Sequence, residues 1–260
     1  MSAALEFRDV SVATANDRLL LRNISLALEE GTVTAILGRS GSGKTTLLRT
    51  VNRMIEATRG KVLVEGRNVA TISPVDLRRN MGYVIQETGL FPHFTVERNV
   101  GIVLEATGQA REQRNNTSRE LLQQVGLDPE SFSHRYPHQL SGGQRQRVGL
   151  ARALAVEPKI LLMDEPFGAL DPLTRVEMQD MLLELLKHLR ATVLLVTHDL
   201  DEALYLAQRV VLVSEGKIVA DLPSREFLQS AQPEIVAYAA AFHRISNDPL
   251  CDHRRQDSHA

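Results

Sequence analysis

A glycine-rich loop, set between an apolar run and an amphipathic segment, constrains this chain more than any other feature. Residues 38–45 read Gly-Arg-Ser-Gly-Ser-Gly-Lys-Thr and directly follow the apolar run of residues 32–37. The pattern predicts a buried strand that ends at Leu37 and a helix that begins near Lys44 and continues to Met54. Such a loop gathers backbone N–H groups around phosphate oxygens at the positive end of a helix. An ordinary Gly/Ser turn is the alternative, but the complete pattern in this context favours a nucleotide-phosphate site.

The loop supplies the first set of candidate binding residues. Lys44 can reach the β- and γ-phosphates of a nucleotide, and the Thr45 hydroxyl can bind Mg²⁺. The residues expected around the phosphates are Gly38, Arg39, Ser40, Gly41, Ser42, Gly43, Lys44, Thr45 and Thr46.

An acidic pair follows a second apolar strand. Residues 160–166 read Ile-Leu-Leu-Met-Asp-Glu-Pro, which predicts a strand buried on both faces of a parallel sheet. Asp164 falls at the carboxyl end of this strand, where ligands bind in α/β sheets, and could orient Mg²⁺ through water. Glu165 could polarise an attacking water molecule. Many strands end in acidic loops without chemistry, so the pair gains its weight from its position after a phosphate loop.

Residues 140–147 point to a family. They read Leu-Ser-Gly-Gly-Gln-Arg-Gln-Arg and lead into an apolar helical segment. This string resembles the signature motif of the ATP-binding cassette (ABC) ATPases. In the order expected for that family, Gln86 resembles the Q-loop glutamine, residues 168–171 (Gly-Ala-Leu-Asp) the D-loop, and His198 the switch histidine. The resemblance covers about residues 5 to 225.

The resemblance implies an ATP hydrolase that uses ATP and Mg²⁺. In such a site the acidic residue after the buried strand acts as general base, and the switch histidine contacts the γ-phosphate. The catalytic residues would be Lys44, Gln86, Glu165 and His198. The metal would be held, directly or through water, by Thr45, Gln86 and Asp164.

The signature does not complete the site of its own chain in this family. It caps the γ-phosphate held by a partner subunit, so that two ATP molecules are sandwiched between two cassettes. One phosphate loop and one signature in a chain thus imply a homodimer with two equal sites. The residues expected to complete the partner's site are Ser141, Gly142, Gly143, Gln144 and Asp171.

The order of segments predicts an α/β fold. We expect a phosphate-loop ATPase core of mainly parallel sheet, with an antiparallel β subdomain and a helical subdomain that bears the signature. The ABC ATPase domain would span residues 1–225, with the helical subdomain at about 87–158. Residues 226–260 would hold a helix, Pro233–His243, and then a polar end with the composition of a disordered tail.

Further strings indicate the branch of the family. Residues 82–93 and 163–175 resemble the ATPases of bacterial importers for osmoprotectants, which are quaternary amines such as glycine betaine, carnitine and choline. The acidic loop that exporters carry before the signature is replaced by Ser-His-Arg-Tyr-Pro at residues 133–137. The expected partners are integral-membrane permease subunits and a substrate-binding protein. The alternatives are an importer for another small solute, a soluble ABC ATPase outside transport, and a small-molecule kinase, which would leave the signature unexplained.

Composition sets outer limits on function. The 30 Lys and Arg residues nearly balance the 32 Asp and Glu residues, so no nucleic-acid partner is expected. The single cysteine, Cys251, is consistent with a reducing cytosol. No apolar stretch approaches the ~20 residues that a membrane-spanning helix needs, so other chains would supply the membrane path. The expected location is the cytoplasmic face of the bacterial inner membrane, as a peripheral subunit.

Two features depart from the family pattern. Members usually stack an aromatic residue on adenine, and alignment through Val10-Ser11 places Thr14 at that position. Adenine stacking is therefore expected to be weak, supplied by another residue, or replaced by aliphatic contact. Many relatives in this branch also carry a regulatory domain after the ATPase core. The residues after 225 are too few for such a domain, so we expect no regulation by that route.

Overall fold

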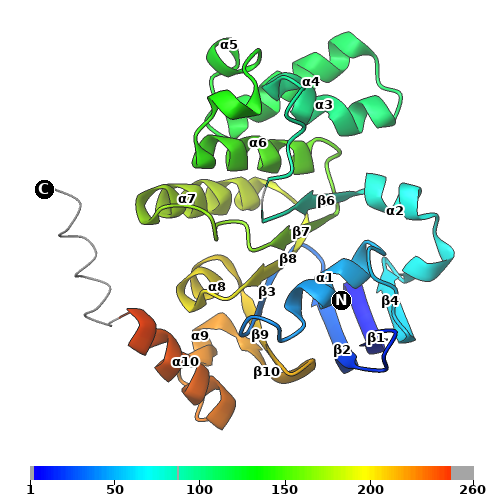
Figure 1. Cartoon of the computed structure of the whole chain (residues 1–260), viewed down its shortest axis with the longest axis vertical. Coiled ribbons are helices and arrows are strands. Elements are labelled where there is room, and N and C mark those ends of the chain that lie inside the picture. Colours follow the sequence, from blue (N-terminus) through cyan, green and yellow to red (C-terminus); the bar gives the residue numbers. More distant parts are fainter. Residues whose placement is uncertain (1–2, 87, 247–260) are drawn as a thin grey trace, which may run out of the picture.

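Two sheets and a set of helices build the molecule, and the computed structural model describes them over residues 3–86 and 88–246 (Figure 1). The smaller sheet is the predicted antiparallel one, with strand order β2-β1-β4-β5. Buried and exposed residues alternate from Ile24 to Leu28, as in a strand with one face in a core. The strands are β1 (Ala3–Ala13), β2 (Leu19–Glu29), β4 (Arg59–Val64) and β5 (Arg67–Asn68).

The larger sheet has six strands in the order β10-β9-β3-β8-β7-β6. Neighbouring strands are parallel except for β9 and β10, which confirms the predicted parallel core. Every residue of β3, β7 and β8 is buried, because side chains from other elements cover both faces of these central strands. The strands are β3 (Val33–Leu37), β6 (Met81–Val84), β7 (Ile160–Asp164), β8 (Thr192–Thr197), β9 (Arg209–Ser214) and β10 (Lys217–Pro223).

Helix α1 (Lys44–Val51) packs between the two sheets. Its residues Leu47 and Val51 share one core cluster with β1, β2 and one face of the larger sheet. The helix is shorter than the sequence pattern predicts, since it ends at Val51 and Met54 is 51% exposed. Arg53 adopts a left-handed conformation with φ 54°, which a continuing right-handed helix cannot contain.

A block of helices separates β6 from β7 in the chain and forms the upper part of the molecule in Figure 1. Val100, Leu122 and Val148, from three different helices, are fully buried in a shared core. The block comprises α3 (Val96–Ala106), α4 (Arg111–Gln124), α5 (Pro129–Phe132), the 3-10 turn Pro137–Gln139 and α6 (Gly142–Leu154). The 3-10 turn Val69–Thr71 and helix α2 (Pro74–Arg79) precede β6.

The remaining helices cover the face of the larger sheet opposite α1. Leu182 of α7 (Pro172–His188) is buried in this core, and Leu183, Leu185, Leu186 and Leu189 pack partly buried against it. The C-terminal helix runs past His243, where its end was predicted, to Ser246. The predicted polar end and Cys251 lie outside the described residues. These helices are α7 (Pro172–His188), α8 (Leu200–Leu206), α9 (Ser224–Phe227) and α10 (Pro233–Ser246).

Candidate functional site

Three motifs that are far apart in the sequence meet at one edge of the larger sheet. β3 pairs with β8 so that Leu37 stands beside Thr197, and β8 pairs with β7 so that Val196 stands beside Asp164. The phosphate loop, the acidic pair and the switch histidine each begin where one of these strands ends. Parallel strands present their carboxyl ends at the same edge, which is where ligands bind in α/β sheets. The fold thereby assembles most of the predicted catalytic residues.

Lys44 is turned into the phosphate loop. Its Nζ donates hydrogen bonds to the carbonyl oxygens of Gly38 at 2.8 Å and Arg39 at 3.1 Å, and the residue is 4% exposed. Burial lowers the pKa of Lys44, while the carboxylates of Glu165 and Asp164 act in the opposite direction. Because Lys44 is the first residue of α1, its ammonium group lies near the N-terminus of that helix. The positive charge and the helix N-terminus both favour a bound anion.

The rest of the loop forms a rim around this ammonium. Gly43 has φ 108°, and a Cβ atom there would come within 2.9 Å of the Leu20 carbonyl oxygen, so only glycine fits without strain. The Gly216 N–H donates to the Ser42 carbonyl at 2.9 Å and holds the loop from the other side. Arg39, Ser40 and Gly41 are exposed, Ser42 is buried, and Thr46 is half-buried in the first turn of α1.

Thr45 and Asp164 form an oxygen pair beside the loop. The Thr45 hydroxyl donates to Asp164 Oδ1 at 2.8 Å, and Asp164 is 5% exposed. Hydroxyl and carboxylate oxygens are ligands that Mg²⁺ prefers. No group of three or more His, Cys, Asp or Glu side chains that could hold a metal occurs in the described part of the chain. The pair thus fits a magnesium ion, which these two side chains would help to hold and whose other ligands would be phosphate and water oxygens.

Glu165 and His198 face each other across the ends of β7 and β8. His198 Nδ1 lies 3.2 Å from Glu165 Oε2, and the histidine side chain is 58% exposed. Glu165 has φ 46°, a left-handed conformation that is uncommon outside glycine, and its N–H donates to the Val196 carbonyl at 2.9 Å. That bond holds the carboxylate beside the switch histidine, where the pair can act on one water molecule.

Gln86 lies one strand further along the same edge. It is exposed in the turn that follows β6, whose Val84 stands beside Met163 of β7. The structure therefore places Gln86 at the same edge of the sheet and at the start of the connection to the helical block. Within residues 3–86 and 88–246, no hydrogen bond joins its side chain to the other predicted site residues.

The signature residues lie elsewhere, at the start of α6 in the helical block (Figure 1). Ser141 caps α6: its hydroxyl accepts from the Gln144 N–H at 3.2 Å, and the Gln144 side chain accepts from the Ser141 N–H at 2.9 Å. A Cβ atom on Gly143 would come within 2.5 Å of Thr174, so α6 begins directly against α7. Asp171 caps α7, and hydrogen bonds from Thr174 lower the pKa of its carboxyl group. Gly142 is exposed.

Three side chains join the site without having been predicted. Arg49 Nη2 lies 3.7 Å from Asp164 Oδ2, and the Tyr83 hydroxyl donates to the same oxygen at 3.5 Å. Arg49 follows Thr45 by one helical turn on α1, so its helical spacing could have revealed it. Tyr238 of α10 donates from its hydroxyl to the His198 carbonyl at 2.8 Å. No local pattern in the sequence joins those two residues.

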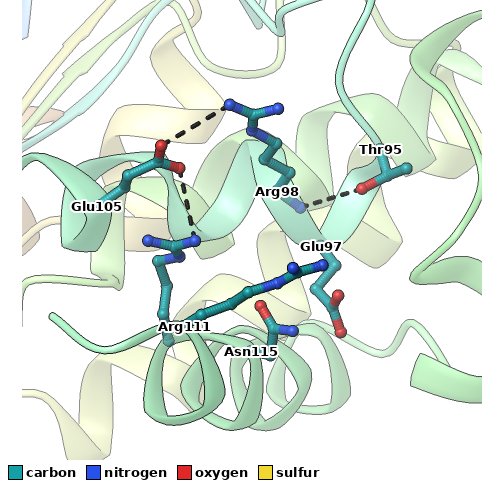
Figure 2. A pocket seen from close by; sticks show the side chains of 7 residues that line it. Thr95, Glu97, Arg98, Glu105, Arg111 and Asn115 are labelled. Atoms are coloured by element: carbon teal, nitrogen blue, oxygen red, sulfur yellow. Dashed lines mark hydrogen bonds and ion pairs between the residues drawn. The ribbon is translucent and has the colours of Figure 1, made fainter.

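A separate pocket of about 340 Å³ lies between α3 and α4 (Figure 2). Glu105 is held between Arg98 and Arg114, with each nitrogen–oxygen distance 3.7 Å. Glu97 is likewise paired with Arg119 at 3.0 Å. Neighbouring arginines thus neutralise the acidic side chains of this pocket. Because the pocket also lies in the helical block, we assign it no part in nucleotide chemistry.

Comparison with known proteins agrees with this geometry. The model of the ABC transporter family matches residues 21–168, which contain the phosphate loop, the signature and the acidic pair. This chain belongs to the ABC transporter family. The fold, with its parallel core, antiparallel sheet and helical block, is that of an ABC cassette.

Several relatives of this cassette are ATP-binding proteins of transport systems. The choline transport ATP-binding protein OpuBA of Bacillus subtilis is 42% identical over 97% of this chain and 66% of its own length. The glycine betaine uptake system ATP-binding protein YehX of Escherichia coli is 43% identical over 83% of this chain and 69% of its own length. The cassette spans 61% and 56% of two further relatives, so these proteins extend beyond the region that it matches.

Solved structures support the same assignment. A dimeric structure of the ATP-binding cassette MJ0796, bound to ADP and Pi, superposes with a TM-score of 0.76 at 32% identity and covers 85% of this chain and 99% of its own. The structure of cbiO1 from Clostridium perfringens gives a TM-score of 0.81 at 25% identity and covers 98% of this chain. None of the helices within the described ranges combines the length and hydropathy needed to span a bilayer.

Proposed function

We propose that this cassette is the ATP-hydrolysing subunit of a bacterial ABC importer for osmoprotectants. The proposal of ATP hydrolysis rests on one observation. The phosphate loop, Asp164, Glu165 and His198 converge at one edge of the larger sheet. Phosphoryl transfer to water needs mainly positioning and charge stabilisation, and this set of residues offers both.

Each residue at this edge takes a defined part in the proposal. Lys44 and the loop amides hold the β- and γ-phosphates, and Thr45 with Asp164 and Gln86 holds Mg²⁺ directly or through water. The ion, when bound, neutralises phosphate charge. Glu165 accepts a proton from the attacking water, and the imidazole of His198, 3.2 Å away, aligns that water with the γ-phosphate.

A second copy of the cassette would complete each site. The N-terminus of α6 presents Ser141 and the N–H groups of Gly142 and Gly143, and such a helix start attracts anions. Gln144 and Asp171 border it. Because residues 141–144 lie in the helical block, apart from the phosphate loop of their own chain, we infer that they and Asp171 serve the phosphates of a partner, in a homodimer with two equal sites.

Coupling to the membrane would run through Gln86 into the helical block. The chain beyond Gln86 carries an aromatic cluster, Phe91, His93 and Phe94, whose ring centroids lie 4.4–6.2 Å apart. Phe91 is 41% exposed although large and apolar, and the guanidinium of Arg98 covers the Phe94 ring at 3.9 Å. We infer that permease subunits dock on this surface and propose that the cassette is a peripheral subunit at the cytoplasmic face of the inner membrane.

The substrate class rests on kinship. The relatives that this chain matches at 42–47% identity are named for choline, carnitine, glycine betaine or osmoprotectant transport. We therefore propose quaternary amines, delivered by a substrate-binding protein, and import of another small solute as the alternative. The ATPase unit would span residues 1–225, with the helical subdomain at about 87–158.

Exchange of the proposed base tests the hydrolytic role. Glu165→Gln keeps the size and polarity of the side chain but removes its basicity, so hydrolysis should fall by roughly 10² or more while ATP still binds. Steady-state phosphate release at saturating Mg-ATP measures the loss, and Glu112→Gln, an exposed change on α4, is the matched control. Near-normal turnover of Glu165→Gln would remove Glu165 from the base role.

Co-purification tests the transport role. An importer subunit should bring integral-membrane proteins with it from detergent-solubilised membranes. Recovery of active ATPase without any membrane partner would favour the soluble, non-transport alternative.

A further inference from the structure

The C-terminal helix α10 reaches the nucleotide site, although its residues lie far from every motif in the sequence. Ile235 of α10 is 1% exposed, and Tyr238 and Ala239 pack partly buried against the main core cluster. In Figure 1 α10, at the red end of the colour scale, lies beside α9 at the side of the larger sheet. The helix is therefore anchored by its apolar side, and the Tyr238 side chain reaches the backbone of His198.

The Tyr238 hydroxyl connects α10 to the loop that carries the switch histidine. It donates to the His198 carbonyl oxygen at 2.8 Å. Burial, with a contribution from Asp199, raises the pKa of Tyr238 to about 12. The hydroxyl is therefore protonated at neutral pH and remains a donor to the carbonyl.

The strand register shows why the His198 backbone takes a partner from outside the sheet. Leu37 of β3 and Thr197 of β8 are the last paired residues of these two parallel strands. His198 therefore lies one residue beyond the ladder, where the chains part to form the ligand crevice. The Tyr238 hydroxyl supplies a hydrogen-bond donor to its carbonyl oxygen there.

The hydrogen bond from Tyr238 has a specific consequence for His198. The residue that follows is already fixed, because the Asp199 N–H donates to Thr197 Oγ1 at 3.0 Å and the Asp199 carboxylate caps α8. The His198 ring itself is largely exposed and touches Glu165. The bond from Tyr238 to the carbonyl thus ties the His198 backbone to α10, which is itself anchored on the core.

We propose that Tyr238 is a positioning residue for hydrolysis, through which α10 holds the backbone of His198 in place so that its ring stays beside Glu165. This inference rests on the proposed ATPase function. It deepens that function by making the C-terminal helix part of the site's framework. Tyr238 touches neither phosphate nor attacking water, and acts only through the backbone of His198.

Tyr238→Phe tests the proposal because it removes the hydroxyl and keeps the ring that packs on the core. We expect kcat for ATP hydrolysis to fall about 3- to 10-fold, the range that one lost hydrogen bond allows, while KM for ATP stays within about twofold. Tyr205→Phe is the matched control, since the Tyr205 hydroxyl is also hydrogen-bonded, to Asp180, but lies on the exposed surface of α8. It should leave both constants unchanged.

A double-mutant cycle separates positioning from a general structural role. In a His198→Ala background, where no ring remains to be positioned, Tyr238→Phe should change hydrolysis less than twofold. An equal effect in both backgrounds, or an unchanged kcat in the single variant, overturns the proposal.

A readout without turnover keeps this inference distinct from the ATPase proposal. The ring resonances of His198 in the nucleotide-free protein should shift in Tyr238→Phe and stay in place in Tyr205→Phe. Unshifted resonances contradict the inference even if the cassette is an active ATPase. Absence of hydrolysis by the wild-type cassette, with its permease present, contradicts the proposed function instead.

Discussion

Replacement of Glu202 by glutamine should stabilise this cassette at alkaline pH and change its stability little at acid pH. Glu202 lies in the first turn of α8 and is 4% exposed. Burial raises the pKa of its carboxyl group from the ordinary 4.5 to about 8, and the charge of Asp199 adds to the effect. Thr197 and the guanidinium of Arg175 lower the pKa of Glu202, but their effect is smaller than that of burial.

The sign follows from where protons bind. Between pH 4.5 and about 8 the folded state keeps the Glu202 proton that the unfolded chain releases, so this group makes the folded state less stable as pH rises through that window. One pKa unit corresponds to about 1.4 kcal/mol. The penalty therefore reaches roughly 4 kcal/mol by pH 8, and glutamine, which has the same shape and no charge, removes most of it.

The assay is the free energy of unfolding from urea titrations at pH 5.5, 7 and 9, for the wild type, Glu202→Gln and the exposed control Glu112→Gln. The difference between Glu202→Gln and the wild type should grow steadily with pH, while Glu112→Gln follows the wild type. A difference that stays constant from pH 5.5 to 9 would show that Glu202 is ionised in the folded cassette throughout, and the burial argument would be wrong.

Two further predictions concern the nucleotide. Lys44→Ala and Ser141→Arg chains, each inactive alone, should form mixed dimers that trap ATP. In such a dimer one of the two sites carries both substitutions and the other carries neither. If the mixed dimers trap no more ATP than the parent variants do, the site is not shared between two chains. Thr14→Tyr should tighten ATP up to roughly tenfold, since an aromatic contact contributes about 0.5–1.5 kcal/mol. It should leave the affinity for base-free triphosphate unchanged by calorimetry, and equal effects on both ligands would show that Thr14 does not face adenine.

The motifs could be predicted because their chemistry needs fixed residue types at fixed spacing. The phosphate loop requires glycine at Gly43, where the Leu20 carbonyl leaves no room for a side chain, and Ser141 and Gln144 form a capping box that sequence alone can reveal. The apolar runs before Gly38 and Glu165 likewise identify central strands, because strands buried on both faces carry no alternation.

Other parts of the site depend on tertiary contacts that no local pattern encodes. The sequence predicts the C-terminal helix but not that Tyr238 reaches His198, since that contact is decided by how α10 packs on the core. The sequence also predicts too great a length for α1. Met54 fits the apolar period of the helix, but Arg53, the residue before it, already leaves the helical conformation. Boundaries and long-range contacts are thus fixed by packing rather than by spacing.

The position of β3 at the centre of the larger sheet affects how this chain must fold. β3 pairs with β8 and β9, so that Val33 stands beside Val193 and Thr34 beside Arg209. During synthesis, the antiparallel sheet of β1, β2 and β4 can form between segments that are close in the chain. The five buried residues of β3, four of them apolar, stay uncovered until strands made much later pair with it. Such high contact order slows folding and exposes an unpaired strand to other chains. Nascent cassettes truncated before β8 should therefore aggregate, or need a chaperone to stay in solution.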